Sequence, residues 1–391
     1  MTDSLAQFTP LTPDNRPEPR SAFDHAFHKL LDDLFEASPI WATHIGYHAL
    51  DDRWPDPSEQ GRTGRLAMLR HHRARIQALA EEELTPDERI DRGIVLDAID
   101  SAEFEEAELR NAAWDPLSYV YGAGSGLFNI LARDFGPWQH RGAAFLGRTR
   151  GLRDYLDAGL GALTGLSGRP VSLLHTETAL AQLGGIDDLV DQGVAEAERR
   201  ATEAGASAEE RAIAAALRSE QEAAHQAIDE FRRRLRAEVA PRAEGDGRLG
   251  PELFQRKLRH TLATDLPYGD LEERARHDYE LVRAEMLRLA QEAWPTWKEG
   301  QQMPSVDLNG AAAGDEIIQS VLDAVSRLHR QPHELLDVSR EEVRRIEDFC
   351  RANNVIGLPD DPLGVTWTPV FMRAYGGAFL ESPGVLDKGL L

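Results

Sequence analysis

The segment from His333 to Asp337 combines residue types that bind zinc in many hydrolases. Its sequence, His-Glu-Leu-Leu-Asp, resembles the first part of a helix motif in which two histidines one turn apart bind zinc and the glutamate activates water. Asp337 stands where the second histidine is expected, and Pro332 directly precedes the motif. A short turn between two helices is therefore the favoured interpretation. Zinc binding stays an alternative, because carboxylates can also ligate this metal.

His44 and His48 form a second candidate pair. On a helix they would lie one turn apart on the same face, a spacing that could chelate a metal. Because the pattern offers no third ligand, packing or hydrogen bonding is the favoured role for both. His175 and Glu177 suit either an acid–base role or, more simply, the N-terminus of a helix. None of these patterns predicts a catalytic residue or a metal ligand.

Composition and charge describe an acidic, soluble chain of 391 residues. Hydrophobic residues make up 41% of it, and no apolar run approaches the roughly 20 residues that cross a bilayer. The net charge of −23 disfavours binding to nucleic acid or to anionic membranes. The basic run at Phe231–Arg236 is flanked by acidic residues and is interpreted as the outer face of a helix. A single cysteine, Cys350, excludes an internal disulfide and, with a loose polar leader at residues 1–20, indicates the cytoplasm.

Capping boxes mark the expected starts of four helices. In each, a Ser, Thr or Asp is followed three positions later by Glu, a pattern whose side chains satisfy free amides of the first turn. These boxes begin at Thr85, Ser207, Asp270 and Ser339. The Ala-, Glu- and Arg-rich stretch at about 186–240 predicts a long helical hairpin, whose narrow apolar stripe suits an arm or a bundle edge.

The end of the chain differs in pattern from the rest. From Val365 to Leu391, β-branched and aromatic residues follow a Pro- and Asp-rich turn, which predicts strand structure. The expected fold is therefore mainly α, one large multi-helix clamp or bundle over residues 21–391, with a small β-sheet or hairpin at 363–391. The glycines of Gly122–Gly126 are interpreted as a flexible turn, because they lack the Lys and Ser or Thr of a phosphate-binding loop.

Several blocks of the sequence together resemble the domain-of-unknown-function 885 family. The most specific block, Ser38–Asp52, has the Pro, Ala-Thr, Gly-x-His and acidic residues of the family's opening signature. Further similar blocks are Trp114–Tyr119, Leu249–Phe254, Glu285-Met286 and Tyr375–Phe379, so the resemblance covers nearly the whole chain. It implies a fold like that of helical zinc metallopeptidases, in which a large clamp surrounds a deep channel with a small sheet at its floor.

The resemblance also implies a zinc site, which family members carry on a His-Glu-containing helix with a later glutamate. That helix lies downstream of the segment similar to Tyr375–Phe379, and no such motif precedes the end of this sequence at Leu391. We therefore expect the N-terminal, substrate-channel portion of a zinc-dependent peptidase-like protein, inactive by itself and without a cofactor of its own. Zinc is expected for the intact family member. Apolar surface exposed on such a portion would favour a homodimer.

The candidate substrate-binding residues are Tyr375, Gly376, Gly377 and Ala378. An extended peptide can add to an exposed strand edge through main-chain hydrogen bonds, and glycines let its backbone approach closely. A bulge or a tight turn explains the two glycines equally well. The expected partner is a peptide or a small molecule in a channel. The alternative function is a non-enzymatic helical binding or scaffold protein, whose channel or hairpin engages a partner.

Overall fold

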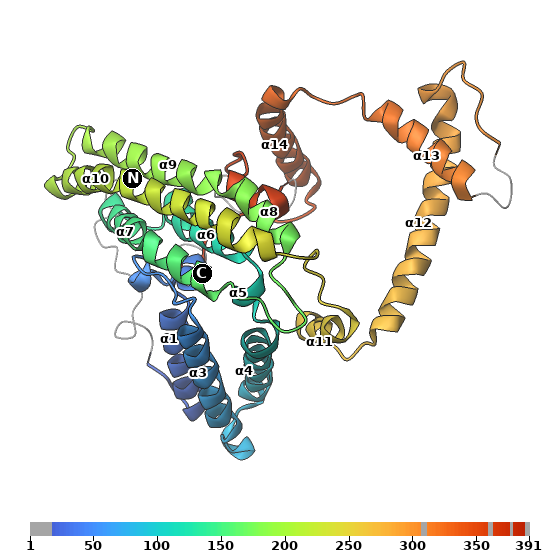
Figure 1. Ribbon diagram of the computed structural model, residues 1–391. Coiled ribbons are helices and arrows are strands. Elements are labelled where there is room, and N and C mark those ends of the chain that lie inside the picture. The colour runs from blue at the N-terminus through green and yellow to red at the C-terminus, as the bar shows by residue number, and fades with distance from the viewer. Residues whose placement is uncertain (1–17, 306–310, 359–362, 376–377, 388–391) are drawn as a thin grey trace. The chain divides into compact units, whose positions relative to one another are not determined.

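The structure, a computed structural model, describes residues 18–305, 311–358, 363–375 and 378–387. These residues are mainly helical, as predicted (Figure 1). Where the sequence predicts one domain, they group into two compact units. Unit 1 contains residues up to Ala263 together with those from Thr368 onward, and unit 2 contains Thr264–Trp367. Across the described residues, no helix is both long enough and apolar enough to cross a membrane.

Unit 1 consists of helices joined mostly by short connections. Its α-helices are α1 (Ala22–Ala37), α2 (Pro39–Ile45), α3 (Glu59–Gln77), α4 (Pro86–Phe104), α5 (Asn111–Trp114), α6 (Leu117–Ala132), α7 (Trp138–Ala162), α8 (Leu173–Gln182), α9 (Gly184–Ala201), α10 (Ala208–Arg234) and α11 (Pro251–Leu262). Its short 3-10 or π segments are η2 (His48–Leu50), η3 (Glu81–Glu83), η4 (Glu105–Leu109), η5 (Leu235–Val239), η6 (Ala240–Arg242) and η8 (Val370–Tyr375).

Two of the four predicted helix starts are confirmed. Thr85 and Ser207 each form a complete capping box, at the N-termini of α4 and α10. The other two predictions are wrong. Asp270 lies inside the first turn of α12 (Tyr268–Trp297), because Pro267 occupies the N-cap position. Ser339 lies inside α14 (Leu335–Asn353), because the 3-10 turn Pro332–Glu334 leads directly into this helix at Leu335.

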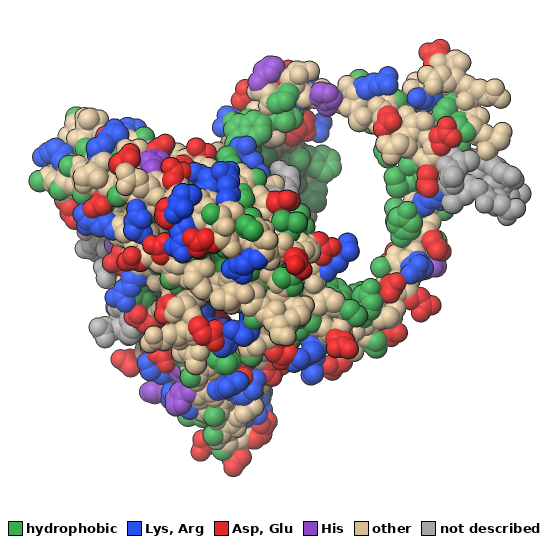
Figure 2. Space-filling model, in the orientation of Figure 1, with side chains coloured by type: hydrophobic (Ala, Val, Ile, Leu, Met, Phe, Trp, Pro, Cys, Tyr) green, Lys and Arg blue, Asp and Glu red, His purple; other side chains and the backbone are tan. Residues whose placement is uncertain are grey.

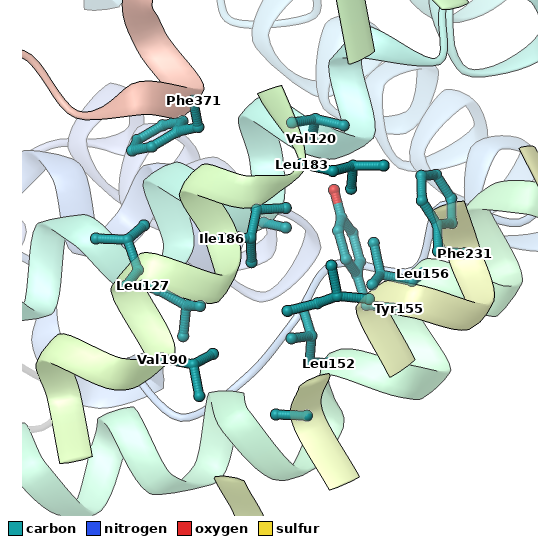
Figure 3. Packing of buried hydrophobic residues seen from close by; sticks show 14 of the residues in the cluster. Val120, Leu127, Leu152, Tyr155, Leu156, Leu183, Ile186, Val190, Phe231 and Phe371 are labelled. Carbon is teal, nitrogen blue, oxygen red and sulfur yellow. The ribbon is translucent and has the colours of Figure 1, made fainter. Parts of the chain in front are cut away.

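The largest core of unit 1 lies among α6, α7, α9 and α10 (Figure 3). Each helix contributes apolar residues from one face, which is the arrangement that amphipathic helices adopt around a shared core. Labelled members are Val120 and Leu127 of α6, Leu152, Tyr155 and Leu156 of α7, Leu183 beside α9, Ile186 and Val190 of α9, and Phe231 of α10. The predicted hairpin at about 186–240 corresponds to α9 and α10. Its apolar stripe packs into this core rather than at an edge.

The basic run beside Phe231 lies on the outer side of α10, as interpreted from the sequence. Arg233 pairs with Glu230 and Arg234 pairs with Glu238 in the same segment, and Arg232 pairs with Asp187 of α9, so nearby carboxylates balance these cations. Acidic and basic side chains are mixed over the face of unit 1 drawn in Figure 2. Such mixing gives no continuous basic surface on that face for a polyanion.

The predicted C-terminal sheet or hairpin is absent from the described part of residues 363–391. Residues 370–375 form the 3-10 helix η8, and residues 378–387 form turns and irregular backbone. The side chain of Phe371 is buried in the helical core instead of lying on a sheet. A strand is stable only when a second strand pairs with it, and no strand is present elsewhere among the described residues. Packing against helices therefore accounts for Phe371, whereas Trp367, Phe379, Leu380 and Val385 are exposed.

Unit 2 contains α12, α13 (Ala311–Val325), η7 (Pro332–Glu334) and α14. Its helices α12 and α13 pack together around a small cluster that includes Trp294 and Ile317. Helix α14 is amphipathic, yet none of its residues is buried among the described residues, and Ile346 and Phe349 are exposed. Most of the buried apolar side chains in the described part of the chain thus belong to unit 1.

Candidate functional site

A segment that we call the C-terminal strap, residues 368–387, is held on unit 1 at two places. The first anchor is Phe371, whose ring is buried where η8 contacts α6, α8 and α9 (Figure 3). Gly124 of α6 makes room for it, because a Cβ atom there would overlap the phenyl ring. Gly122–Gly126, interpreted from the sequence as a flexible turn, instead lies inside a helix, so that interpretation is wrong. Here the missing side chain admits an aromatic ring.

The second anchor joins the far end of the strap to the segment that follows α2. The amide of Leu386 donates to the carbonyl of Ile45 over 2.8 Å. Gly46 has a φ of 96°, a conformation that side chains with a Cβ rarely adopt. A Cβ on Gly46 would also lie 2.6 Å from the amide nitrogen of Asp387. The close approach therefore requires glycine at this position.

An ion pair supports the same anchor. Arg133, which follows α6, pairs with Glu381 of the strap and donates to the carbonyl of His44 over 2.5 Å. Its guanidinium also lies 3.0 Å from His44 Nδ1. His44 is consequently engaged by an arginine and does not share a ligand position with His48. The two histidines contact different neighbours, which agrees with the favoured hydrogen-bonding role.

His48 occupies the centre of a buried polar cluster. Its Nδ1 lies 2.9 Å from Asp51 Oδ2, and its Nε2 lies 2.7 Å from Asp387 Oδ1. The Thr43 hydroxyl donates to the other oxygen of Asp51 over 2.6 Å and accepts from Arg148 over 2.6 Å. The side chains of both histidine-bound aspartates and of His48 are nearly excluded from solvent. This cluster ties η2, α2, α7 and the strap together.

The electrostatics of the cluster follow from burial and from these bonds. Burial alone would lower the pKa of His48, but hydrogen bonds to Asp387 and Asp51 and the charges of both carboxylates outweigh it, so the pKa is raised. Burial alone would raise the pKa of Asp51, but the nearby His140 imidazole and hydrogen bonds from His48 and Thr43 lower it to about 2. Burial lowers the pKa of Arg148 to about 10, which leaves it charged at neutral pH.

The predicted substrate-binding residues lie between the two anchors of the strap. Tyr375 is the last residue of η8, and Ala378 is exposed, while Gly376 and Gly377 lie outside the described residues. Residues 378–380 form no main-chain hydrogen bond with another described residue. The side chain of Leu380 is 71% exposed, and Phe379 beside it is also exposed. This part of the strap presents apolar side chains together with backbone groups that have no main-chain partner among the described residues.

His175 pairs with a residue that sequence reasoning did not select as a site. Its Nδ1 lies 2.9 Å from Asp115 Oδ1, and this bond raises the pKa of His175. The same carboxylate oxygen accepts from the amide of Leu117. His175 lies in the first turn of α8, in agreement with the favoured interpretation, and Ser172 is its N-cap. The signal that could have identified Asp115 is its place in the family-like block Trp114–Tyr119.

The Asp115–His175 pair has few additional donors around it. The first amides of α8 are already bonded, those of Leu173 and Leu174 to carbonyls at 244–245 and that of His175 to the Ser172 hydroxyl. An anion at this helix N-terminus would find no free amide. The pair resembles a histidine oriented by a carboxylate, but it lacks an accompanying oxyanion site.

The His333 motif forms part of a helix start. His333 and Glu334 lie in η7, and the Glu334 carboxylate accepts from the amide of Gln331. This arrangement supports the favoured interpretation of a turn, although the turn continues directly into α14. Among the described residues, no group of three or more His, Cys, Asp or Glu side chains could hold a metal ion.

A family model identifies the family of this chain, and one solved structure shares its fold. No curated protein matches the chain. Among solved structures, it is similar to one described as "a putative lipoprotein of unknown function from Shewanella oneidensis", with a TM-score of 0.63 and 24% identity. The match covers 87% of this chain and 59% of that one, so it concerns the fold of only part of the longer protein. The family model described as "Bacterial protein of unknown function (DUF885)" matches residues 39–390, and the chain therefore belongs to this family.

Proposed function

We propose that this chain forms the substrate-binding portion of a zinc-dependent peptidase-like protein, and that an extended peptide lies along the C-terminal strap. The observation that supports this proposal is the exposed stretch at residues 378–380, which lies between two anchored ends. Its backbone groups have no described main-chain partner, and its side chains are apolar. A peptide could therefore pair with it through main-chain hydrogen bonds and bury Phe379 and Leu380.

The described residues do not supply a zinc site, because no group of three metal-binding side chains is present among them. This chain would accordingly bind the peptide, and its described residues would take no part in hydrolysis. Tyr375 and Ala378 remain the candidate contacts at the start of the exposed stretch, with Gly376 and Gly377 between them. The side chain of Leu380 adds an apolar contact that the sequence pattern did not single out.

Binding to the strap can be tested with a library of short fluorescent peptides and fluorescence anisotropy. Replacement of Leu380 by Asp should weaken binding at least about tenfold, because a charge would be placed against the apolar side chains of the peptide. Leu328→Asp is the matched control, since Leu328 is 75% exposed but belongs to unit 2. Equal affinities for the two variants would contradict the proposal.

Main-chain recognition has its own test. Peptides N-methylated at alternate positions lose one backbone donor each, so methylation on the edge that faces the strap should weaken binding while methylation on the opposite edge should not. If every methylated position had the same effect, strand-like pairing with the strap would be excluded.

The alternative function is a non-enzymatic helical binding or scaffold protein. An observation in its favour is that the cluster around His48 is closed and structural, with its charges mutually paired. Binding assays with the Leu380→Asp variant separate the two functions, because neither function requires this chain to cleave a peptide by itself. Loss of peptide binding in that variant would support the substrate-binding portion, and a protein partner that binds the original chain and the variant equally would support the scaffold.

A further inference from the structure

The attachment of the strap depends on an imidazole ring that faces a carboxylate at each nitrogen. A carboxylate only accepts hydrogen bonds, so both contacts of His48 are satisfied only when both of its nitrogens carry a proton. A neutral ring keeps one N–H and presents a lone pair to the other carboxylate. Loss of one proton must therefore break one of the contacts, either that with Asp51 or that with Asp387.

The surroundings decide which contact breaks. Asp51 is the more deeply buried carboxylate, and it also receives the Thr43 hydroxyl, which is bonded in turn to Arg148. The amide of Gly384 donates to Asp387 over 2.5 Å, and this aspartate is the less buried of the two, with 9% of its side chain exposed against 1% for Asp51. A neutral ring is consequently expected to keep its proton on Nδ1, where it donates to Asp51, and to lose the contact of Nε2 with Asp387.

Among the described residues, three further groups lie near His48 or Asp51, and none of them pairs with Asp387. Phe135 stacks on the ring with a centroid distance of 3.6 Å and covers one face of it. His140 of α7 approaches the cluster on the Asp51 side, with its Nε2 3.7 Å from Asp51 Oδ2. Arg148 reaches the cluster through Thr43, also on that side. The imidazolium is therefore the cation that pairs with Asp387 within the described residues.

We propose that His48, Asp51 and Asp387 form a pH-operated clasp, which holds the end of the C-terminal strap when the imidazole is charged and releases it when the imidazole becomes neutral. The clasp also holds the 384–387 turn, because Asp387 accepts from Gly384 and Leu386 donates to Ile45. The inference concerns the attachment of the strap and goes beyond peptide binding. It can therefore stand or fail separately from the proposed function.

The raised pKa of His48 sets the direction of the pH effect. A histidine with a folded-state pKa above its unfolded value of about 6.5 stabilises the fold fully below that value. This stabilisation is lost as the pH rises through the folded-state pKa. The strap should consequently be closed in mildly acidic solution and loosened in alkaline solution.

Hydrogen exchange measured by mass spectrometry on the C-terminal peptide tests the clasp. Exchange rates of the 384–387 amides, divided by their intrinsic rates at each pH, should rise at least about tenfold between pH 5 and pH 8.5. His48→Gln should exchange fast at both pH values, because a neutral glutamine cannot pair with two carboxylates. Circular dichroism of each variant verifies that the helices are intact.

Asp387→Asn provides a second variant with the opposite outcome. Its amide NH2 can donate to the lone pair of a neutral His48, and its oxygen can still accept from Gly384. The strap should therefore stay protected at pH 8.5 in this variant.

The matched control is His225→Gln, since His225 also bridges two aspartates but belongs to α10. This change should leave the exchange of the strap as in the original protein. Exchange of the strap that does not vary with pH in the original protein would overturn the proposal, as would an Asp387→Asn strap that opens at high pH. Loss of the pH effect in the control would overturn it as well.

Discussion

Two histidines of this protein each bridge a pair of aspartates, but they do so in different environments. His48 joins Asp51 to Asp387 in the interior, and only 3% of its side chain is exposed. His225 of α10 joins two aspartates of the neighbouring helix α9, and 26% of its side chain is exposed. Histidine–aspartate contacts therefore join the C-terminal strap to the interior of unit 1 in one region, and they join two adjacent helices in the other.

The difference indicates that burial, more than the number of hydrogen bonds, decides how much such a cluster contributes to stability. Near the surface, water and ions can replace a lost partner, so an ion pair is worth little. Inside the protein, removing one partner leaves a charge without compensation, and the cost is several kcal/mol. The His48 cluster should thus control the attachment of the strap, whereas the His225 cluster should only modestly strengthen the hairpin of α9 and α10.

The largest contrast is expected from removing one aspartate in each region. Asp51→Ala leaves His48 and the Thr43 hydroxyl without their shared buried acceptor, removes a negative charge near Arg148, and should lower the free energy of unfolding by about 3–5 kcal/mol. Asp191→Ala removes a largely exposed partner of His225 and should cost less than about 1 kcal/mol. Urea denaturation at pH 6, followed by circular dichroism, measures both. Similar losses would show that burial does not separate the two clusters.

A smaller contrast is expected from one glycine in each region. Gly46 and Gly205 both have positive φ values, 96° and 99°. Gly46→Ala adds a clash with Asp387 to the backbone strain, whereas a Cβ on Gly205 meets no atom within 4 Å. We expect a loss above about 2 kcal/mol for the first variant and about 1 kcal/mol for the second. Thermal unfolding compares them, and a milder effect at Gly46 would argue against tight docking of the strap.

The smallest effect should be the response to salt. The stability difference between the original protein and His225→Gln should shrink by a few tenths of a kcal/mol from 0.05 to about 1 M NaCl, since mobile ions screen exposed pairs. The corresponding difference for His48→Gln should hardly change. Urea denaturation at pH 6 in both salts measures these values. A salt effect of equal size at His48 would mean that water reaches the clasp.

Part of the fold could be predicted from local patterns. Capping at Thr85 and Ser207 was predictable because the donor and the acceptor lie three residues apart. The same pattern misled at Asp270, where a preceding proline already begins the helix. Tertiary packing also placed the stripe of α10 in the core, although its sparse apolar residues suggested an edge.

The candidate site was less predictable than the helices. His44 and His48 looked like a chelating pair because a continuous helix would place them on one face. Gly46 ends α2 between them in a left-handed conformation, so the two rings diverge. Likewise, Asp115 could be recognised as the partner of His175 only after folding brought α8 next to the start of α6.

By itself, the sequence determined the mainly helical character of the chain, its acidic surface and its family, because helix periodicity, charge and motif blocks are written in neighbouring residues. Only the tertiary structure decided which backbone conformation the last segment adopts and which of its side chains are buried. Aromatic and β-branched residues there are compatible with a strand or with a buried anchor, and the side chain of Phe371 is buried in the helical core. The contact of His48 with Asp387 joins residues 339 positions apart, a relationship that no local pattern encodes.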